Sequence, residues 1–259
     1  MDPYRIRASS IAAIIDCPLR GLSIALGLVK PLPSTAPAAI GTACHEGTAA
    51  FDRARLEGTP ITPDDAAEIV MDLVWMPGEE VDWSGVTQEQ AEARALGVHT
   101  RYCVDIAPTI EYEAVELTLE PLVVDVAGIS IELTGTLDRV YKQESKRGIL
   151  DIKTGARVMS QNPGKHKGQL ATYEILYEHT AKQSIELPGV IGQLQTSADY
   201  DVSLRPVENA RDALVGNDYT PGYLYFIAQM IKTGDFYGNP SSSLCSKKYC
   251  PLYKECIYR

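Results

Sequence analysis

Two charged residues interrupt an apolar stretch at residues 149–155, which read ILDIKTG. The stretch predicts a buried strand, and side chains two residues apart on a strand share one face. Asp151 and Lys153 therefore point the same way. Asp138 lies 13 residues before Asp151, across a short connection. A hairpin would bring the two carboxylates together, and like charges at such a distance repel each other unless a cation lies between them.

A divalent cation would make this arrangement favourable. Mg²⁺ prefers oxygen ligands, commonly one or two carboxylates with water and substrate phosphates, and the carbonyl of Ile152 could supply another oxygen. Lys153 would face the same space, where it could orient a water molecule or neutralise charge on a phosphate. Such a group suits the hydrolysis of a phosphodiester. The competing interpretation is a simple salt bridge of Asp151 with Lys153, with Asp138 as a turn residue at a strand end.

A helical pattern after Pro163 adds two polar residues to this group. In GQLATYEILY, Gln169 and Tyr173 are four residues apart and so share one helix face. Together, GTLDRV, ILDIKTG and GQLATYEILY resemble the RecB-like branch of the PD-(D/E)XK nucleases. In that family a G-x-x-D strand end, a D-x-K strand and a Q-x-x-x-Y helix follow one another in this order.

The resemblance implies a metal site and roles for its residues. The family has a metal-ligand histidine on an upstream helix, and His45 in GTACHEG matches it. Lys153 would assist the attacking water, with Gln169 and Tyr173 positioning Lys153 or the phosphate backbone. The expected ligands of Mg²⁺ or Mn²⁺ are His45, Asp138, Asp151 and the carbonyl of Ile152. The three other histidines match no motif and are interpreted as structural: His99, His166 and His179.

Six cysteines are present, and Cys245, Cys250 and Cys256 crowd into the last 15 residues. Zinc sites usually have four ligands and begin with gaps of two to four residues. Here the gaps hold four and five residues, and the fourth ligand is missing from the tail. The candidates for it are Cys17, Cys44 and Cys103.

A Cys-Pro pair near the N-terminus and three cysteines after the nuclease core resemble RecB-like nucleases that carry an iron–sulfur cluster. The resemblance implies a [4Fe–4S] cluster, which needs four thiolates, on Cys17, Cys245, Cys250 and Cys256. Such a cluster would join the two ends of the chain and help to shape a channel for single-stranded DNA. Structural zinc and free thiols are the alternatives. Cys44 and Cys103 are expected to pack between helices.

The net charge of −10 argues against a general polyanion binder, but the charge is unevenly distributed. Residues 139–167 contain eight basic residues and two acidic ones, a local charge of +6. This segment is either a solvated loop or a surface that follows phosphates, together with the basic tail. The expected DNA contacts are Arg139, Arg157, Lys165 and Lys167, with Lys247, Lys248 and Lys254 in the tail.

Apolar periods predict which elements carry these residues. Helices are expected at 39–57, 62–75, 87–106, after Pro163 and at 221–233. Strands are expected at 112–120, 122–127, 129–142, 148–155 and twice within 189–206. The order predicts an α/β fold with a restriction-endonuclease-like core, in which helices flank a mixed central sheet. Residues 1–259 would form one nuclease domain, with a mainly helical region (1–110), the core (111–235) and a cysteine-rich tail (236–259).

No apolar run approaches the roughly 18 residues of a membrane span, and the N-terminus lacks a signal-peptide layout. We expect an intracellular, cytoplasmic protein of a prokaryote or phage. Its expected activity is that of a metal-dependent DNA exonuclease on single-stranded or frayed DNA, in recombination, repair or replication. One alternative is a CRISPR-adaptation-type nuclease that trims DNA before integration, alongside integration partner proteins. Another is a DNA-binding scaffold that has lost catalysis and holds structural zinc.

Overall fold

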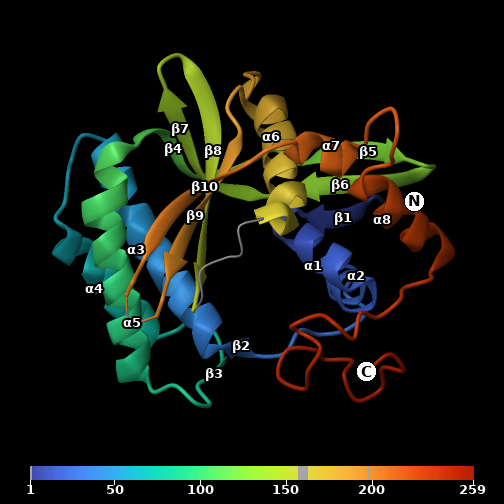
Figure 1. Ribbon diagram of the computed structural model, residues 1–259, viewed down its shortest axis with the longest axis horizontal. Helices are drawn as coiled ribbons and strands as arrows, with labels where there is room; N and C mark the ends of the chain where they lie inside the picture. The colour runs from blue at the N-terminus through green and yellow to red at the C-terminus, as the bar shows by residue number, and fades with distance from the viewer. Residues whose placement is uncertain (1, 157–162, 198) are drawn as a thin grey trace.

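The computed structural model describes residues 2–156, 163–197 and 199–259 (Figure 1). The first part of the chain contains β1 (Tyr4–Arg7), α1 (Ile11–Asp16), α2 (Pro18–Ala25), β2 (Ser34–Thr35), α3 (Ala36–Leu56), α4 (Pro63–Trp75), β3 (Val81–Asp82) and α5 (Gln88–Arg101). Next come β4 (Glu111–Thr118), β5 (Leu122–Val126), β6 (Ile129–Thr134), β7 (Thr136–Gln143), β8 (Lys146–Gly155) and α6 (Lys167–Ala181). The last elements are β9 (Gly189–Gln195), β10 (Val202–Val207), α7 (Ala210–Val215) and α8 (Tyr223–Thr233).

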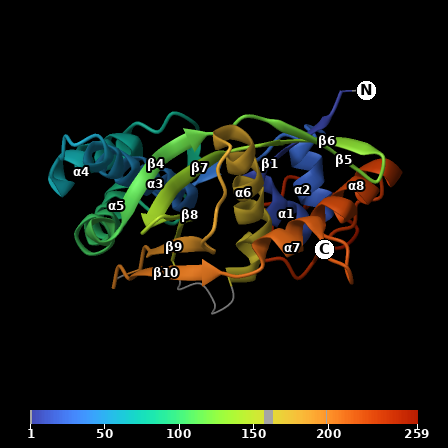
Figure 2. The same ribbon diagram turned by 90° about the horizontal axis from the view of Figure 1, so that it is seen from above.

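A five-stranded sheet with the order β10-β9-β8-β7-β4 lies at the centre of the fold (Figure 1). β7 and β8 are antiparallel, with Arg139 opposite Leu150, whereas β8 and β9 are parallel, with Asp151 opposite Ile191. α3, α4 and α5 lie on one side of this sheet and α6 on the other (Figure 2). The sheet is therefore mixed and flanked by helices, which confirms the predicted α/β fold class.

Two hydrophobic clusters form on the two faces of the sheet. Ile149 and Ile191 pack with Leu170 of α6 in the first cluster. Ile152 and Leu194 lie three positions further along β8 and β9, and they pack with residues of α3, α4 and α5 in the second. Side chains alternate along a strand, so positions three apart face opposite sides. Burial on both faces explains why the sequence around Asp151 is almost continuously apolar.

Local signals place the helices well. Thr62 and Thr87 are N-caps with complete capping boxes, in which their side chains accept hydrogen bonds from the backbone N–H groups of Asp65 and Gln90. The helix predicted at 62–75 is confirmed as α4. The helix predicted at 87–106 is only partly right, because α5 ends at Arg101 and a π-helical segment, Tyr102–Ile106, follows it.

The single strand predicted at 129–142 is wrong, because Gly135 divides it. β6 belongs to a three-stranded sheet, β1-β6-β5, whereas β7 belongs to the central sheet. A Cβ atom on Gly135 would lie 2.8 Å from Cε1 of Tyr173, so a larger residue would displace that ring. The sequence also did not predict β1, whose partner in parallel pairing is β6 (Tyr4 opposite Ile131). A four-residue strand with so distant a partner has no local signal.

Candidate metal centre and cysteine cavity

Asp138 and Asp151 meet where β7 and β8 pair. The register that sets Arg139 opposite Leu150 brings Asp138 and Asp151 opposite each other. The backbone N–H of Ile152 donates a 2.6 Å hydrogen bond to Oδ2 of Asp138. Asp151 is fully buried, and only 6% of Asp138 is exposed. The hairpin expected from the sequence thus holds two carboxylates together with little solvent.

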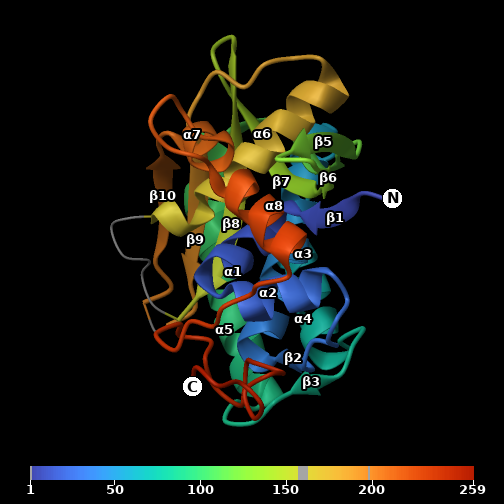
Figure 3. The same ribbon diagram turned by 90° about the vertical axis from the view of Figure 1, so that its right-hand side faces the viewer.

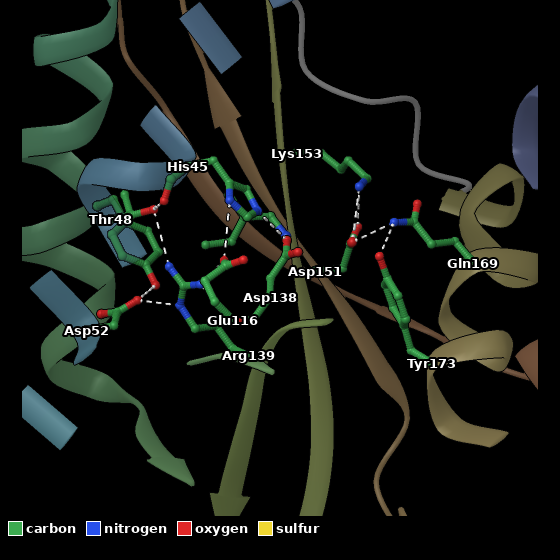
Figure 4. A network of polar contacts seen from close by, with 12 residues as sticks. His45, Thr48, Asp52, Glu116, Asp138, Arg139, Asp151, Lys153, Gln169 and Tyr173 are labelled. Carbon is green, nitrogen blue, oxygen red and sulfur yellow. Dashed lines mark hydrogen bonds and ion pairs between the residues drawn. The ribbon is translucent and has the colours of Figure 1, made fainter. Parts of the chain in front are cut away.

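α3 contributes a histidine to this centre, and β4 a third acid. Nε2 of His45 lies 2.8 Å from Oδ2 of Asp138, and its Nδ1 lies 3.4 Å from Oε1 of Glu116 (Figure 4). Ligand atoms of these three residues lie within 4.8 Å of one another, close enough to hold a metal ion. Glu116 was not among the residues predicted for this centre. In the sequence, Glu116 is marked only as an acidic residue in a predicted strand. Its contact with His45 depends on the pairing of β4 with β7, which brings it to the centre.

Asp151 takes part in a second set of contacts. Nζ of Lys153 lies 2.8 Å from Oδ2 of Asp151, on the same strand. Nε2 of Gln169 donates to Oδ1 of Asp151 at 2.9 Å and lies 3.1 Å from the Tyr173 hydroxyl (Figure 4). The structure therefore brings together all the side chains that the three motifs predicted. Asp151, however, contacts Lys153 and Gln169 rather than His45.

The two carboxylates differ in their protonation. Burial, followed by the charge of Asp138, raises the pKa of Asp151 to about 7. Burial acts in the same direction on Asp138, but the hydrogen bond from His45 and the charges of His45 and Lys153 hold the pKa of Asp138 below its ordinary value. Burial lowers the pKa of His45, and Asp138 and Glu116 more than reverse this, so it is raised. The centre thus carries an ionised Asp138 beside an Asp151 that gives up its proton only near neutral pH.

An open cleft of about 240 Å³ reaches this centre between α3 and β8. It is lined by Gly41, Thr42, His45, Ile152, Lys153 and Thr154. A Cβ atom on Gly41 would lie 2.7 Å from Oγ1 of Thr154, so glycine permits the close approach of helix and strand. Substrate could therefore reach Lys153 and His45 from solvent.

The sequence of the chain matches the model of a known protein family. Residues 5–256 match the model of the PD-(D/E)XK nuclease superfamily. The chain belongs to this superfamily. A search of curated proteins finds no match.

Solved structures include a protein with the same fold as this nuclease. The crystal structure of a candidate exonuclease from Eubacterium rectale aligns with a TM-score of 0.53 and 11% identity, covering 93% of this chain and 87% of that one. The crystal structure of SSO0001 aligns with a TM-score of 0.45 and 12% identity, over 99% of this chain and 87% of that one. The first of these structures shares the fold of this chain.

Arg139, expected on a DNA-binding surface, lies inside the nuclease. Its side chain is fully buried, with Nε 2.7 Å from Oδ2 of Asp52 and Nη1 3.0 Å from Oε1 of Glu116. The Tyr102 hydroxyl donates to the same Asp52 oxygen at 2.6 Å. The expectation that Arg139 contacts phosphates is therefore corrected, because this strand position faces α3 rather than solvent. Its ion pairs instead tie β7 to α3 and β4 beside the metal centre.

Other members of the basic segment are also neutralised by acids from elsewhere in the chain. Lys142 and Arg147 both pair with Glu113 of β4, as Lys153 pairs with Asp151. Of the remaining expected DNA contacts, Lys165 is exposed, Lys167 is half-buried and Arg157 lies outside the described residues. The local +6 of the sequence is thus not a free positive surface.

The four cysteines that the resemblance selects lie around one cavity of about 20 Å³. Cys17 lies between α1 and α2, and Cys245, Cys250 and Cys256 lie in the tail. The tail runs alongside α2 (Figure 3), where the Leu19 N–H donates to the Tyr237 carbonyl at 2.9 Å. Cys44 and Cys103 instead pack in the second hydrophobic cluster, as expected. The nuclease therefore brings its two ends together through side chains that could bind a soft metal.

A buried arginine faces the same cavity. Arg20 is only 7% exposed, and within the described chain its Nε and Nη2 atoms have no hydrogen-bond partner. Its nearest acid is Asp16, with Nη2 3.6 Å from Oδ2. Burial raises the pKa of the Cys250 thiol, which the charge of Arg20 partly offsets. Unused donors of a buried cation beside four thiols suit a negatively charged group between the cysteines.

Within the described residues, no helix is both long and apolar enough to cross a membrane.

Proposed function

We propose that this nuclease is a metal-dependent DNA exonuclease of the RecB-like branch, acting on single-stranded or frayed ends. The observation that carries the proposal is the buried pair of carboxylates, Asp138 and Asp151, with Lys153 and His45 at an open cleft. Membership of the PD-(D/E)XK superfamily supports a hydrolytic nuclease. The candidate exonuclease from Eubacterium rectale, which shares the fold, favours an exonuclease over the alternatives.

The donor set fits a hard divalent cation. His45, Asp138, Asp151 and the Ile152 carbonyl would hold Mg²⁺ or Mn²⁺, and Glu116 adds an acid that already contacts His45. Burial and, after it, repulsion from Asp138 raise the pKa of Asp151, and a cation would relieve the repulsion. Once bound, the cation supplies Lewis-acid polarisation of a phosphate oxygen and a lower pKa for a bound water.

The remaining residues supply proton and charge control. Asp151 overcomes the effect of burial and raises the pKa of Lys153, so Lys153 carries a full positive charge. Its ammonium can orient the attacking water and balance negative charge on the phosphate. Gln169 holds the carboxylate of Asp151 and lies beside Tyr173, so these two residues position Asp151, and through it Lys153.

A cleavage assay with end-blocked substrates tests the proposed exonuclease activity. Labelled single-stranded DNA is incubated with the protein and Mn²⁺, with the 5′ end, the 3′ end or both ends blocked. We expect shortening from a free end and none without divalent ions. Absence of cleavage by the wild type, or equal cleavage by Asp138→Ala, would overturn the proposal.

For the cysteine cavity we propose a [4Fe–4S] cluster on Cys17, Cys245, Cys250 and Cys256. A tetrahedral zinc site with Zn–S bonds of about 2.3 Å would hold its sulfurs roughly 3.8 Å apart. All six cysteines are in the described residues, and no group of three ligand atoms within 4.8 Å includes one of them. The wider spacing of the sulfurs and the buried Arg20 support a larger, negatively charged group.

Anaerobically purified protein tests the cluster. We expect a brown protein with the broad absorbance of thiolate-bound iron clusters, at about 400 nm, and about four irons per chain. Cys250→Ser should lose this absorbance, whereas Cys44→Ser, at a buried position outside the cavity, should keep it. A colourless protein that contains zinc would refute the cluster and leave the nuclease proposal standing.

A further inference from the structure

A second hollow, of about 480 Å³, adjoins the metal centre on the side of Tyr173. It is formed by β1, by the ends of β4 and β6, by the start of β7 and by α6. The side chains or backbone that line it belong to Arg5, Arg7, Ser9, Thr118, Leu119, Pro121, Thr134, Gly135, Thr136 and Tyr173. Most of the polar members carry hydrogen-bond donors, and none is an acid.

The hollow continues the strands that carry the metal centre. Thr136 lies two residues before Asp138 on β7, and Thr118 lies two residues after Glu116 on β4, so each strand runs directly from the centre into the hollow. Thr118 and Thr136 are opposite each other, with their hydroxyl oxygens 3.4 Å apart. A strand of nucleic acid leaving the metal centre in this direction would pass over these two hydroxyls.

Tyr173 links the two sites from the helix side. Its hydroxyl lies 3.1 Å from Nε2 of Gln169, which holds Asp151. Its ring lies against Gly135, in the wall of the hollow. Because residue 135 is glycine, the Tyr173 ring can contact the strand. Tyr173 therefore connects the wall of the hollow to Gln169, and through it to Asp151.

β1 carries two arginines that differ in their ion pairing. Arg5 and Arg7 are two residues apart on the strand and both are exposed. Nε of Arg5 lies 2.5 Å from Oε2 of Glu132 on β6, so its charge is balanced. Arg7 lies opposite Thr134 instead, and in the described part of the chain it forms no ion pair. A guanidinium without an acid, beside hydroxyl donors, is suited to a phosphate.

We propose that this hollow is a subsite for a backbone phosphate of the DNA strand, outside the phosphodiester that is cut, with Arg7 as its main ligand. The inference rests on the proposed nuclease function and extends it to the path of the substrate. Recognition of this kind positions the strand without reading its sequence. Arg7 positions the strand and takes no part in the chemical step.

The test compares Arg7→Gln with Arg53→Gln, which removes the same charge from an exposed position on α3. Binding of a fluorescent oligothymidylate is measured with Ca²⁺ at several salt concentrations. We expect Arg7→Gln to weaken binding by about tenfold and to reduce the slope of log K against log[salt] by roughly 0.7, the value of one single-strand phosphate contact. Arg53→Gln should change neither.

Kinetics with two substrates separate positioning from damage to the centre. Bis(p-nitrophenyl) phosphate has one phosphodiester and no neighbouring phosphate, so its hydrolysis with Mn²⁺ should be equal in the wild type and Arg7→Gln. For the oligonucleotide, KM should rise by about tenfold and kcat should stay the same.

The outcomes distinguish the two proposals. If the wild type binds and cleaves DNA but Arg7→Gln matches Arg53→Gln in affinity and salt slope, the subsite is refuted and the nuclease stands. An equal loss with both substrates would also refute it, because Arg7 would then act on the metal centre. A wild type that neither binds nor cleaves DNA would overturn both proposals.

Discussion

The metal centre and the cysteine cavity differ in how the chain holds them. At the metal centre, every side chain projects from a strand or helix, and hydrogen bonds already join His45 to Asp138 and Gln169 to Asp151. Around the cavity, three cysteines lie in a tail that forms turns rather than helices or strands, and Cys17 lies at a break between two short helices. The first site is built by the fold, whereas the second joins segments that the fold leaves without regular structure.

This difference indicates what each site requires of a ligand. The metal centre balances its charges within the protein, so a metal-free form should keep its architecture. The tail has few backbone hydrogen bonds to the rest of the molecule, and a group bound to four thiolates would supply the missing cross-link. The cavity should therefore matter for stability and the metal centre for chemistry.

Lys153→Ala should have the largest effect of the substitutions considered, and it should act on catalysis at the metal centre. We expect loss of roughly 10²- to 10⁴-fold in kcat with Mn²⁺, the usual effect of removing a group that controls proton transfer. Absorbance from the proposed cluster at the cysteine cavity should hardly change. Lys146→Ala, at the exposed start of β8, is the matched control. A variant that keeps wild-type kcat would remove Lys153 from the chemistry.

Arg139→Met tests whether the metal centre depends on a buried ion pair. The substitution leaves the carboxylate of Asp52 buried without its cation, which should lower the free energy of unfolding by about 3–5 kcal/mol. Urea unfolding measures the loss. The double variant Asp52→Asn with Arg139→Met should recover a large part of it, because residue 52 is then neutral and Glu116 keeps its contact with His45. A loss below about 1 kcal/mol, within the range of exposed pairs, would contradict the structural role.

The pH dependence of metal affinity tests the protonation of the centre. The raised pKa values of Asp151 and His45 mean that both must give up protons before they bind a cation. Below pH 7, affinity for Mn²⁺ should rise at least about tenfold per pH unit, and it should level off above the pKa values. Calorimetry in two buffers counts the protons released.

Glu174→Gln provides the control for this measurement. Burial raises the pKa of Glu174 to about 7 as well, but Glu174 lies on α6 and is not among the residues at the centre. Proton release on binding Mn²⁺ should therefore be unchanged in this variant. Affinity that does not vary between pH 5.5 and 7.5 in the wild type would show that Asp151 is not a ligand.

Arg20→Met should have the smallest effect, a shift of the reduction potential, and it tests whether Arg20 acts on the group in the cavity. Removing a buried positive charge disfavours the more negative, reduced form of a cluster, so the reduction potential should fall by roughly 60 mV, about tenfold in the one-electron equilibrium. Kcat with Mn²⁺ should stay the same. Lys254→Met, an exposed change in the tail, is the control, and equal potentials in the two variants would show that Arg20 does not act on the proposed cluster.

Local patterns predicted a large part of the fold. α4 and the start of α5 follow from Thr62, Thr87 and their capping boxes, and the strands follow from their period of two. The failures occur where distant segments decide the outcome. The chain passes from one sheet into another at Gly135, where a side chain would collide with the Tyr173 ring, and β1 is a strand through its pairing with β6.

The sequence by itself determined which side chains share a strand or a helix face. Asp151 with Lys153, and Gln169 with Tyr173, follow from spacings of two and four residues, since backbone geometry alone sets these neighbours. Only the tertiary structure decided which segments meet. It placed Glu116 beside His45, neutralised Arg139 with Asp52, and brought Cys17 to the tail. Such contacts depend on the packing of whole elements, whose energy is spread over many residues and leaves no signal at any single position.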